Sequence, residues 1–158
     1  MGRFTFPIAD VSAGQEVYPA DTYSFEIAEV KGFVGKVPDA DAQAAGKTQA
    51  HGVRGRVKIV TEGPHKNKGF LNSLYMHNDA SQQMTKRFVM AALGYAMSQE
   101  KEFNELYAAK DWSYDENGEV GEVWRELTGK MITANVTVGI NKMRNEPQNN
   151  FAWVPYGS

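Results

Sequence analysis

The chain of 158 residues contains no cysteine and only six prolines, and none of its apolar runs is long enough to cross a bilayer. Without cysteine the fold cannot use disulfides or thiolate metal sites, which suits a reducing compartment. The first residues, MGRFTFPIADVSAG, lack the apolar stretch of a signal peptide. These absences predict a cytoplasmic protein that makes no contact with a membrane.

The chain also has no large excess of either charge, because its formal net charge is only −2. The charges are nevertheless segregated along the chain. Residues 31–90 contain ten Lys or Arg and four acidic residues, whereas residues 91–130 contain four basic and nine acidic ones. Since screening restricts electrostatic forces to about 10 Å at moderate salt, a local basic segment can still attract a polyanion.

Signatures of catalysis are equally scarce. The motifs G-x-S-x-G and H-E-x-x-H are absent, and the three histidines are far apart in sequence without zinc-ligand spacing. Four acidic residues in the segment 111–119 surround an Asn117-Gly118 turn signal, a pattern typical of a solvated hairpin. We therefore expect a protein that is not an enzyme and that has no cofactor and no metal.

The most informative stretch that is present is VRGRVKIVTEGPHKNKGFLNSLYMH, residues 53–77. Its first half alternates with period two, so that Val53, Val57 and Ile59 point to one face and Arg54, Arg56 and Lys58 to the other. A Gly63-Pro64 turn follows, and then a mostly apolar run over residues 70–76. This pattern predicts a β-hairpin with one apolar and one basic face.

The remaining elements follow from periodicity. We predict an irregular N-terminal arm over residues 1–17 and one domain over residues 18–158. Within the domain we expect a first strand through Tyr23, Phe25 and Ile27, a long loop over 31–52, and a helix over 79–98 capped by Asp79 or Ser81. An acidic insert over 99–121, a long strand over 130–142, a turn over 143–150 and a short strand over 151–156 complete the chain.

This order of elements favours a mostly β fold. Five strands with a helix between the third and fourth are expected of an OB-fold barrel, in this case with the acidic insert before the fourth strand.

Several motifs also resemble a known family. They are GRVKIVTEGPHKNKGFLNSL, the helix end ALGYA, the strand ELTGKMITANVTV and a final N-x-F-A-W-V-P-Y. Together they are similar to the phage single-stranded DNA-binding proteins with an OB fold, whose domain was long described only as one of unknown function. The resemblance implies an OB fold that binds single-stranded DNA during phage replication or recombination in the cytoplasm of the infected host cell.

Such binding requires cations for phosphates and π-faces for bases. Successive outward residues of a strand lie about 6.6 Å apart, near the phosphate spacing of an extended single strand. The candidate DNA-binding residues are Arg54, Arg56, Lys58, Lys66 and Lys68 for phosphates, and Tyr75, Phe33 and Trp153 for stacking. Two simpler interpretations stay open: outward basic residues can serve solubility alone, and aromatic residues at alternate positions are commonly core.

The expected partner is single-stranded DNA, and phage or host replication proteins or a second copy of the chain are further candidates. The alternative function is that of a phage structural or assembly protein that packs through aromatic surfaces, for which Trp112 and Trp124 of the acidic region and the aromatic N-terminal arm are the motivation.

Overall fold

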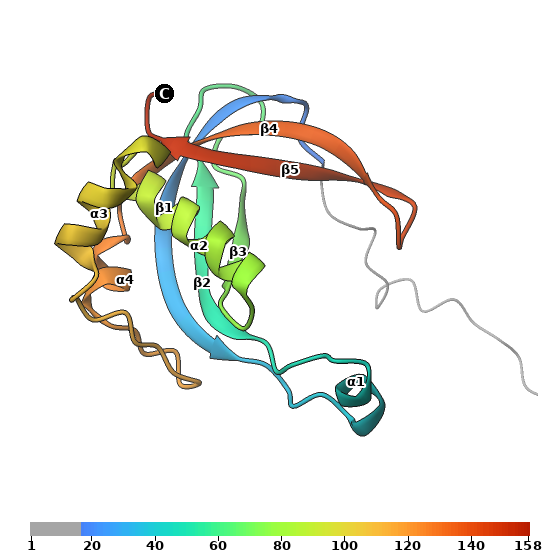
Figure 1. Cartoon of the computed structure of the whole chain (residues 1–158). Helices are drawn as coiled ribbons and strands as arrows, with labels where there is room; N and C mark the ends of the chain where they lie inside the picture. The colour runs from blue at the N-terminus through green and yellow to red at the C-terminus, as the bar shows by residue number, and fades with distance from the viewer. Residues whose placement is uncertain (1–16) are drawn as a thin grey trace, which may run out of the picture.

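The computed structural model describes residues 17–158, so the predicted N-terminal arm lies outside the described residues except for Val17. In chain order the elements are β1 (Asp21–Val34), α1 (Ala40–Ala44), β2 (His51–Ile59), β3 (Gly69–Tyr75), α2 (Asp79–Ala92), the short 3₁₀ helix η2 (Met97–Gln99), α3 (Glu100–Tyr107), α4 (Glu122–Glu126), β4 (Met131–Asn141) and β5 (Glu146–Pro155). Figure 1 shows their arrangement.

The strands form one antiparallel sheet in the order β3-β2-β1-β4-β5. The predicted mostly β fold with five strands, and with a helix between the third and fourth, is therefore confirmed. The sheet is open, with β3 and β5 as its two edges. Side chains bring these edges together all the same, because the ring centroids of Phe70 on β3 and Phe151 on β5 lie 5.1 Å apart.

Strand β1 is the centre of the sheet and contains a β-bulge at Ala28. Ile27 pairs with Val57 and Glu29 with Arg56, so one extra residue of β1 is accommodated between two consecutive residues of β2. Before the bulge Phe25 and Ile27 face the core; after it, Val30 and Gly32 do. The prediction of a loop from residue 31 was therefore wrong for its first part, because β1 continues to Val34.

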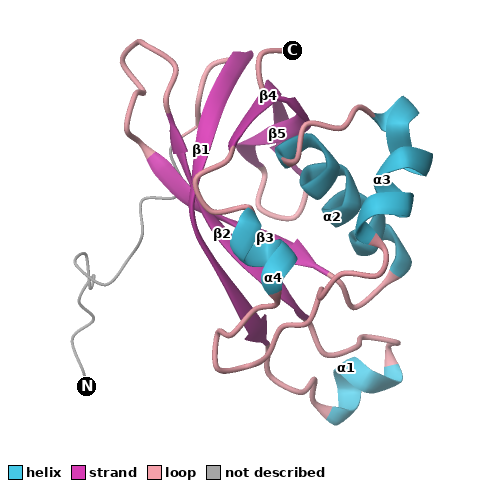
Figure 2. Cartoon of the chain, turned by 90° about the vertical axis from the view of Figure 1, so that its left-hand side faces the viewer, coloured by secondary structure: helices cyan, strands magenta, loops and turns pink. Residues whose placement is uncertain are grey.

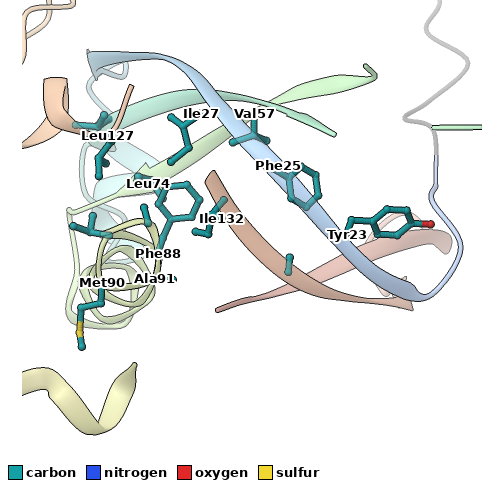
Figure 3. Close-up of a cluster of buried hydrophobic side chains, with 14 of the residues drawn as sticks. Tyr23, Phe25, Ile27, Val57, Leu74, Phe88, Met90, Ala91, Leu127 and Ile132 are labelled. Atoms are coloured by element: carbon teal, nitrogen blue, oxygen red, sulfur yellow. The ribbon is translucent and has the colours of Figure 1, made fainter. Parts of the chain in front are cut away.

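The core lies between the sheet and α2, which crosses β1, β2 and β3 in Figure 1 and packs against β3, β4 and β5. Alternate residues of the strands meet the buried face of α2 there, as the close-up in Figure 3 shows for Ile27, Leu74 and Ile132 around Phe88. Removing a side chain of this size from water stabilises the fold by about 1.5–3 kcal/mol. The alternation of β2 predicted this arrangement, since Val53 and Val57 are both 0% exposed.

Helix α2 is shorter than predicted, and its cap is one residue earlier. The side chain of Asn78 accepts a hydrogen bond from the Ser81 amide at 2.8 Å, so Asn78 is the N-cap. The helix ends at Ala92 because Gly94 has a φ of 86°, a left-handed conformation that closes a helix. Met84 lies one turn before the buried Phe88 on this helix and is nevertheless 70% exposed. Among residues 17–158 no helix has both the length and the apolar character required to span a bilayer.

The acidic region folds into α3, an isolated bridge between Tyr114 and Val120, and α4. Its turn lies directly on β1. The amide of Gly32 donates to the Gly118 carbonyl at 3.3 Å, and a Cβ at Gly32 would lie 2.6 Å from the Asp115 carbonyl oxygen. Only glycine lets the turn approach this closely. We call residues 100–126 the acidic lobe, because they contain nine acidic and three basic side chains.

The last two strands form a long hairpin. The predicted strand over 130–142 is β4, whereas the predicted turn over 143–150 was too long, since β5 already begins at Glu146. Asn145, with a φ of 53°, occupies the left-handed position of the turn. The hairpin reaches away from the helices in Figure 1, and there Val138 and Ile140 leave the core and are 47% and 60% exposed.

Candidate nucleic-acid interface

Strand β2 presents its three cations on the side of the sheet that faces away from the core. Val53, Val57 and Ile59 point inward, so the alternate residues Arg54, Arg56 and Lys58 point outward. Both arginines are exposed and Lys58 is half-buried. Figure 2 shows helices α2 and α3 on the other side of these strands. Neither the helices nor the acidic lobe therefore seals the guanidinium groups.

Strand β3 adds apolar and aromatic groups beside these cations. Gly52 pairs with Tyr75 and Arg56 with Leu71, which places Tyr75 and Leu71 on the same face as the arginines. Tyr75 is 40% exposed and Leu71 is 54% exposed. Because β3 contains no charged residue, the surface is cationic along β2 and apolar along β3. This combination matches the needs of an unpaired polynucleotide, which has phosphates on one side and bases on the other.

Strand β1 contributes a buried ring, that of Phe33, which packs beneath these exposed side chains. Phe33 pairs with Gly52, so its ring lies on the basic side of the sheet, between Arg54 and Tyr75. The Arg54 guanidinium carbon is 4.2 Å from the Phe33 ring centroid, and the Tyr75 ring meets Phe33 edge-on at 5.6 Å. Phe33 is only 9% exposed. It therefore cannot offer a free face to a base and instead orients Arg54 and Tyr75.

We call this surface the basic face; its members are Lys31, Phe33, Arg54, Arg56, Lys58, Leu71 and Tyr75.

The electrostatics of the basic face are uneven. On β1, Glu29 lies opposite Arg56, and its carboxylate pairs with Lys31 at 3.0 Å. Within residues 17–158, no carboxylate lies within ion-pair distance of Arg54, Arg56 or Lys58. The carboxylates Glu26 and Glu29 are on the β1 side, while β3 has none. A polyanion is thus favoured along β2 and β3 rather than across β1.

Two of the predicted lysines belong to the turn that joins β2 to β3. Lys66 and Lys68 are both exposed in this connection, which follows the Lys58 end of β2. Lys66 is engaged by Glu62 in an ion pair. An exposed i,i+4 ion pair of this kind contributes little to the stability of the fold. The turn can extend the basic face, but its cations are less available than the arginines of β2.

Trp153 is not part of the basic face. Its ring centroid lies 5.3 Å from that of Phe25 and 5.0 Å from that of Phe88, and it stacks on Phe151. This residue therefore contributes to the core between β5 and α2, as the simpler interpretation of alternate aromatics holds. Conversely, the sequence-based list omitted Lys31 and Leu71. Leu71 alternates with Tyr75 on β3, a signal that could have identified it.

Titrating groups with shifted pKa values lie away from the basic face. Burial raises the pKa of Tyr114, whose hydroxyl is 2.6 Å from Nδ1 of His51. The hydroxyl and backbone of Ser113 hydrogen-bond Asp111 and lower the pKa of its carboxyl. In the described part of the chain, no three histidine or acidic side chains are placed to hold a metal ion. The groups that the basic face itself presents are guanidinium, ammonium and aromatic side chains.

Comparisons with known proteins add no family to this geometry. The basic face must be interpreted from its own chemistry, namely two exposed arginines, a half-buried lysine and an exposed tyrosine on adjacent strands. The chain matches no model of a known protein family, and a search of curated proteins finds no match to it either.

Proposed function

We propose that this protein binds single-stranded DNA along the basic face and coats it without strong sequence preference, in phage replication or recombination. The observation that carries the proposal is that Arg54, Arg56 and Lys58 lie on one strand beside the exposed ring of Tyr75. None of the three forms an ion pair with a carboxylate of residues 17–158. Phosphates and the π-faces of bases are common to every sequence, so such a surface discriminates little between them.

The fold supports the same proposal. We infer that the open sheet is an OB-type barrel, since its strand order, its antiparallel pairing and the helix between β3 and β4 agree with that architecture. The contact of Phe70 with Phe151 would be the place where β3 approaches β5 to close the barrel. OB folds bind oligonucleotides on the face of strands 2 and 3, the two strands that carry the arginines and Tyr75 here.

Single strands are favoured over duplexes for a physical reason. The bases of a duplex are stacked on each other and cannot use Tyr75 or Leu71, whereas an unpaired strand can turn its bases onto β3. Stacking on an aromatic side chain is worth about 1–3 kcal/mol per base. A duplex would retain only the phosphate contacts.

The test is fluorescence anisotropy with labelled oligo-dT, oligo-rU and a duplex over a series of salt concentrations. We expect tight binding to oligo-dT that weakens steeply with salt. In a variant with Arg54, Arg56 and Lys58 all changed to alanine, affinity should fall roughly 100-fold, and the salt slope should decrease by about 2, since each phosphate contact on a single strand contributes about 0.7.

A matched control removes the same number of cations elsewhere. Lys101, Lys110 and Lys130 are exposed and lie outside the basic face, so their triple alanine variant should bind oligo-dT as the unmodified protein does. Equal affinity in both triple variants would contradict the assignment of the basic face. No binding to any oligonucleotide by the unmodified protein would overturn the proposed function itself.

The alternative of a structural subunit that packs through aromatic surfaces has less support. It was motivated by Trp112 and Trp124, but Trp124 is 1% exposed and Trp112 is half-buried. Both indole N–H groups donate to backbone carbonyls within the acidic region, at 2.8 Å each. These two side chains stabilise the chain's own fold, and the aromatic N-terminal arm lies outside the described residues.

A further inference from the structure

A second candidate surface lies on the side of the molecule that the basic face does not use. A cavity of about 290 Å³ lies between α2 and the acidic lobe, and Val89, Phe103, Trp112 and Trp124 form much of its wall. Its lining also includes the exposed residues Asn104 and Ala108, so the cavity reaches the surface. Its size approaches the lower end of ordinary ligand and peptide pockets.

The wall of this cavity favours an apolar occupant. The indole N–H of Trp112 donates to the Tyr107 carbonyl and that of Trp124 to the Trp112 carbonyl, each at 2.8 Å. The Thr85 hydroxyl donates to the Tyr75 carbonyl, also at 2.8 Å. With these donors already bonded inside the protein, the cavity presents mainly carbon and fixed rings. An aromatic or branched aliphatic side chain would bury its surface there without leaving a polar group unpaired.

The charges around the cavity favour a positively charged partner. The acidic lobe, which supplies one wall, contains nine acidic side chains and three basic ones. The cation on the opposite wall, Lys86, lies 3.6 Å from Glu100 and is thus partly neutralised. An acidic ligand, including DNA, would be repelled from this region, whereas a basic one would be steered toward it.

We propose that the cavity and the acidic lobe together form a docking site for a basic amphipathic helix of a partner protein. The helix would insert one large apolar side chain into the cavity and set Lys or Arg residues against the carboxylates of the acidic lobe. The cavity lies on the helix side of β1, β2 and β3 and the basic face on the other side, so the two sites can be occupied together (Figure 2). The proposal goes beyond DNA binding and does not depend on it.

The test is a selection from a random peptide display library against the full chain, carried out both without DNA and with excess oligo-dT. Counter-selection uses the variant Ala108→Trp, in which the new ring fills the opening of the cavity. We expect selected sequences to be rich in Lys and Arg, with apolar residues spaced at i, i+3 or i+4, and i+7. Acidic or unpatterned sequences, or no selective binders at all, would overturn the proposal.

Individual synthetic peptides from the selection then allow a matched comparison. Ala109 is exposed like its neighbour but does not line the cavity, so Ala109→Trp is the control for Ala108→Trp. Affinity should fall at least tenfold in Ala108→Trp and stay unchanged in Ala109→Trp, while both variants keep their melting temperature and their affinity for oligo-dT. Equal peptide affinity in the two variants would show that the cavity is not the site.

Charge is tested separately from the cavity. Glu102→Gln with Glu105→Gln neutralises two exposed carboxylates of α3. We expect a slower association rate and a weaker salt dependence for the same peptides. An unaltered salt dependence would contradict the proposed role of the acidic lobe.

Discussion

The basic face and the acidic lobe use similar residues for opposite purposes. On the basic face the ring of Tyr75 is 40% exposed, and Arg54, Arg56 and Lys58 have no carboxylate partner among residues 17–158. In the acidic lobe Trp124 is 1% exposed, and the rings of Phe103 and Tyr107 stack at 5.0 Å, so the aromatic residues are structural and the charges surround them. The exposed residues of the basic face thus contribute little to the stability of the fold, whereas the aromatic residues of the acidic lobe stabilise it.

The largest expected effect is on stability, and it tests the acidic lobe. Trp124→Ala should lower the free energy of unfolding by roughly 3–5 kcal/mol, because it leaves a cavity beside Trp112. Urea unfolding followed by circular dichroism measures the loss. Affinity for oligo-dT, corrected for the folded fraction, should not change. A weaker corrected affinity would break the separation between the two regions.

The next effect is on binding, and it tests the basic face. Tyr75→Ala should weaken oligo-dT binding by about 1–3 kcal/mol, since a stacked base loses its platform. Tyr75→Phe should bind almost as the unmodified protein, because the ring is retained. Anisotropy titrations measure the affinity of both variants for oligo-dT. If Tyr75→Phe weakens binding as much as Tyr75→Ala does, DNA contacts the hydroxyl and not the ring.

A smaller effect concerns the support beneath the basic face. Phe33→Leu should weaken oligo-dT binding by about 0.5–1 kcal/mol, because the guanidinium of Arg54 loses the ring on which it rests. The same change in an Arg54→Ala background should then have almost no further effect. A double-mutant cycle measures this coupling, and additive losses would assign Phe33 a role unrelated to Arg54.

The smallest effect is a pH dependence of the acidic region. Burial raises the pKa of Tyr107, with Glu126 as a further cause, and burial also raises the pKa of Tyr114. A folded-state pKa above the unfolded one gives stability that is complete below pH 10.0 and is lost as the pH rises through the folded pKa. Melting temperature should therefore fall above pH 10.0 and fall less in a Tyr107→Phe, Tyr114→Phe variant. Parallel curves for both proteins would refute this.

The sequence predicted the parts of the molecule where a single period runs without interruption. Alternation over β2 placed Arg54, Arg56 and Lys58 outward. The predicted long strand over 130–142 is β4, whose apolar alternate residues are buried at Ile132, Ala134 and Val136 and exposed at Val138 and Ile140. These are the strands that have one buried face, where a register error would move every apolar residue into water. The three cations that β2 contributes to the basic face were predictable for this reason.

Errors occurred where tertiary contacts or a local cap override the period. The alternation of β1 changes phase at Ala28, so residues 31–34 resembled a loop. Helix α2 ends at Ala92, two residues before the left-handed Gly94, although apolar residues continue beyond it, and Tyr95 packs on Phe103 of α3 instead. Trp153 resembles an exposed aromatic of a final strand, yet only the position of Phe88 on α2 reveals it as core. No pattern within one element contains that information.

The extra residue at Ala28 has a consequence for how this surface can change. With Ala28 deleted, Glu29 would follow Ile27 directly and would keep its place opposite Arg56, so Lys31 and Phe33 would stay on the basic face and the ladder would lose only its bulge. The added residue therefore serves the local bend and twist of β1, and the side on which the following residues lie does not depend on it. Homologous chains can differ in length by one residue at this position and still present the same surface.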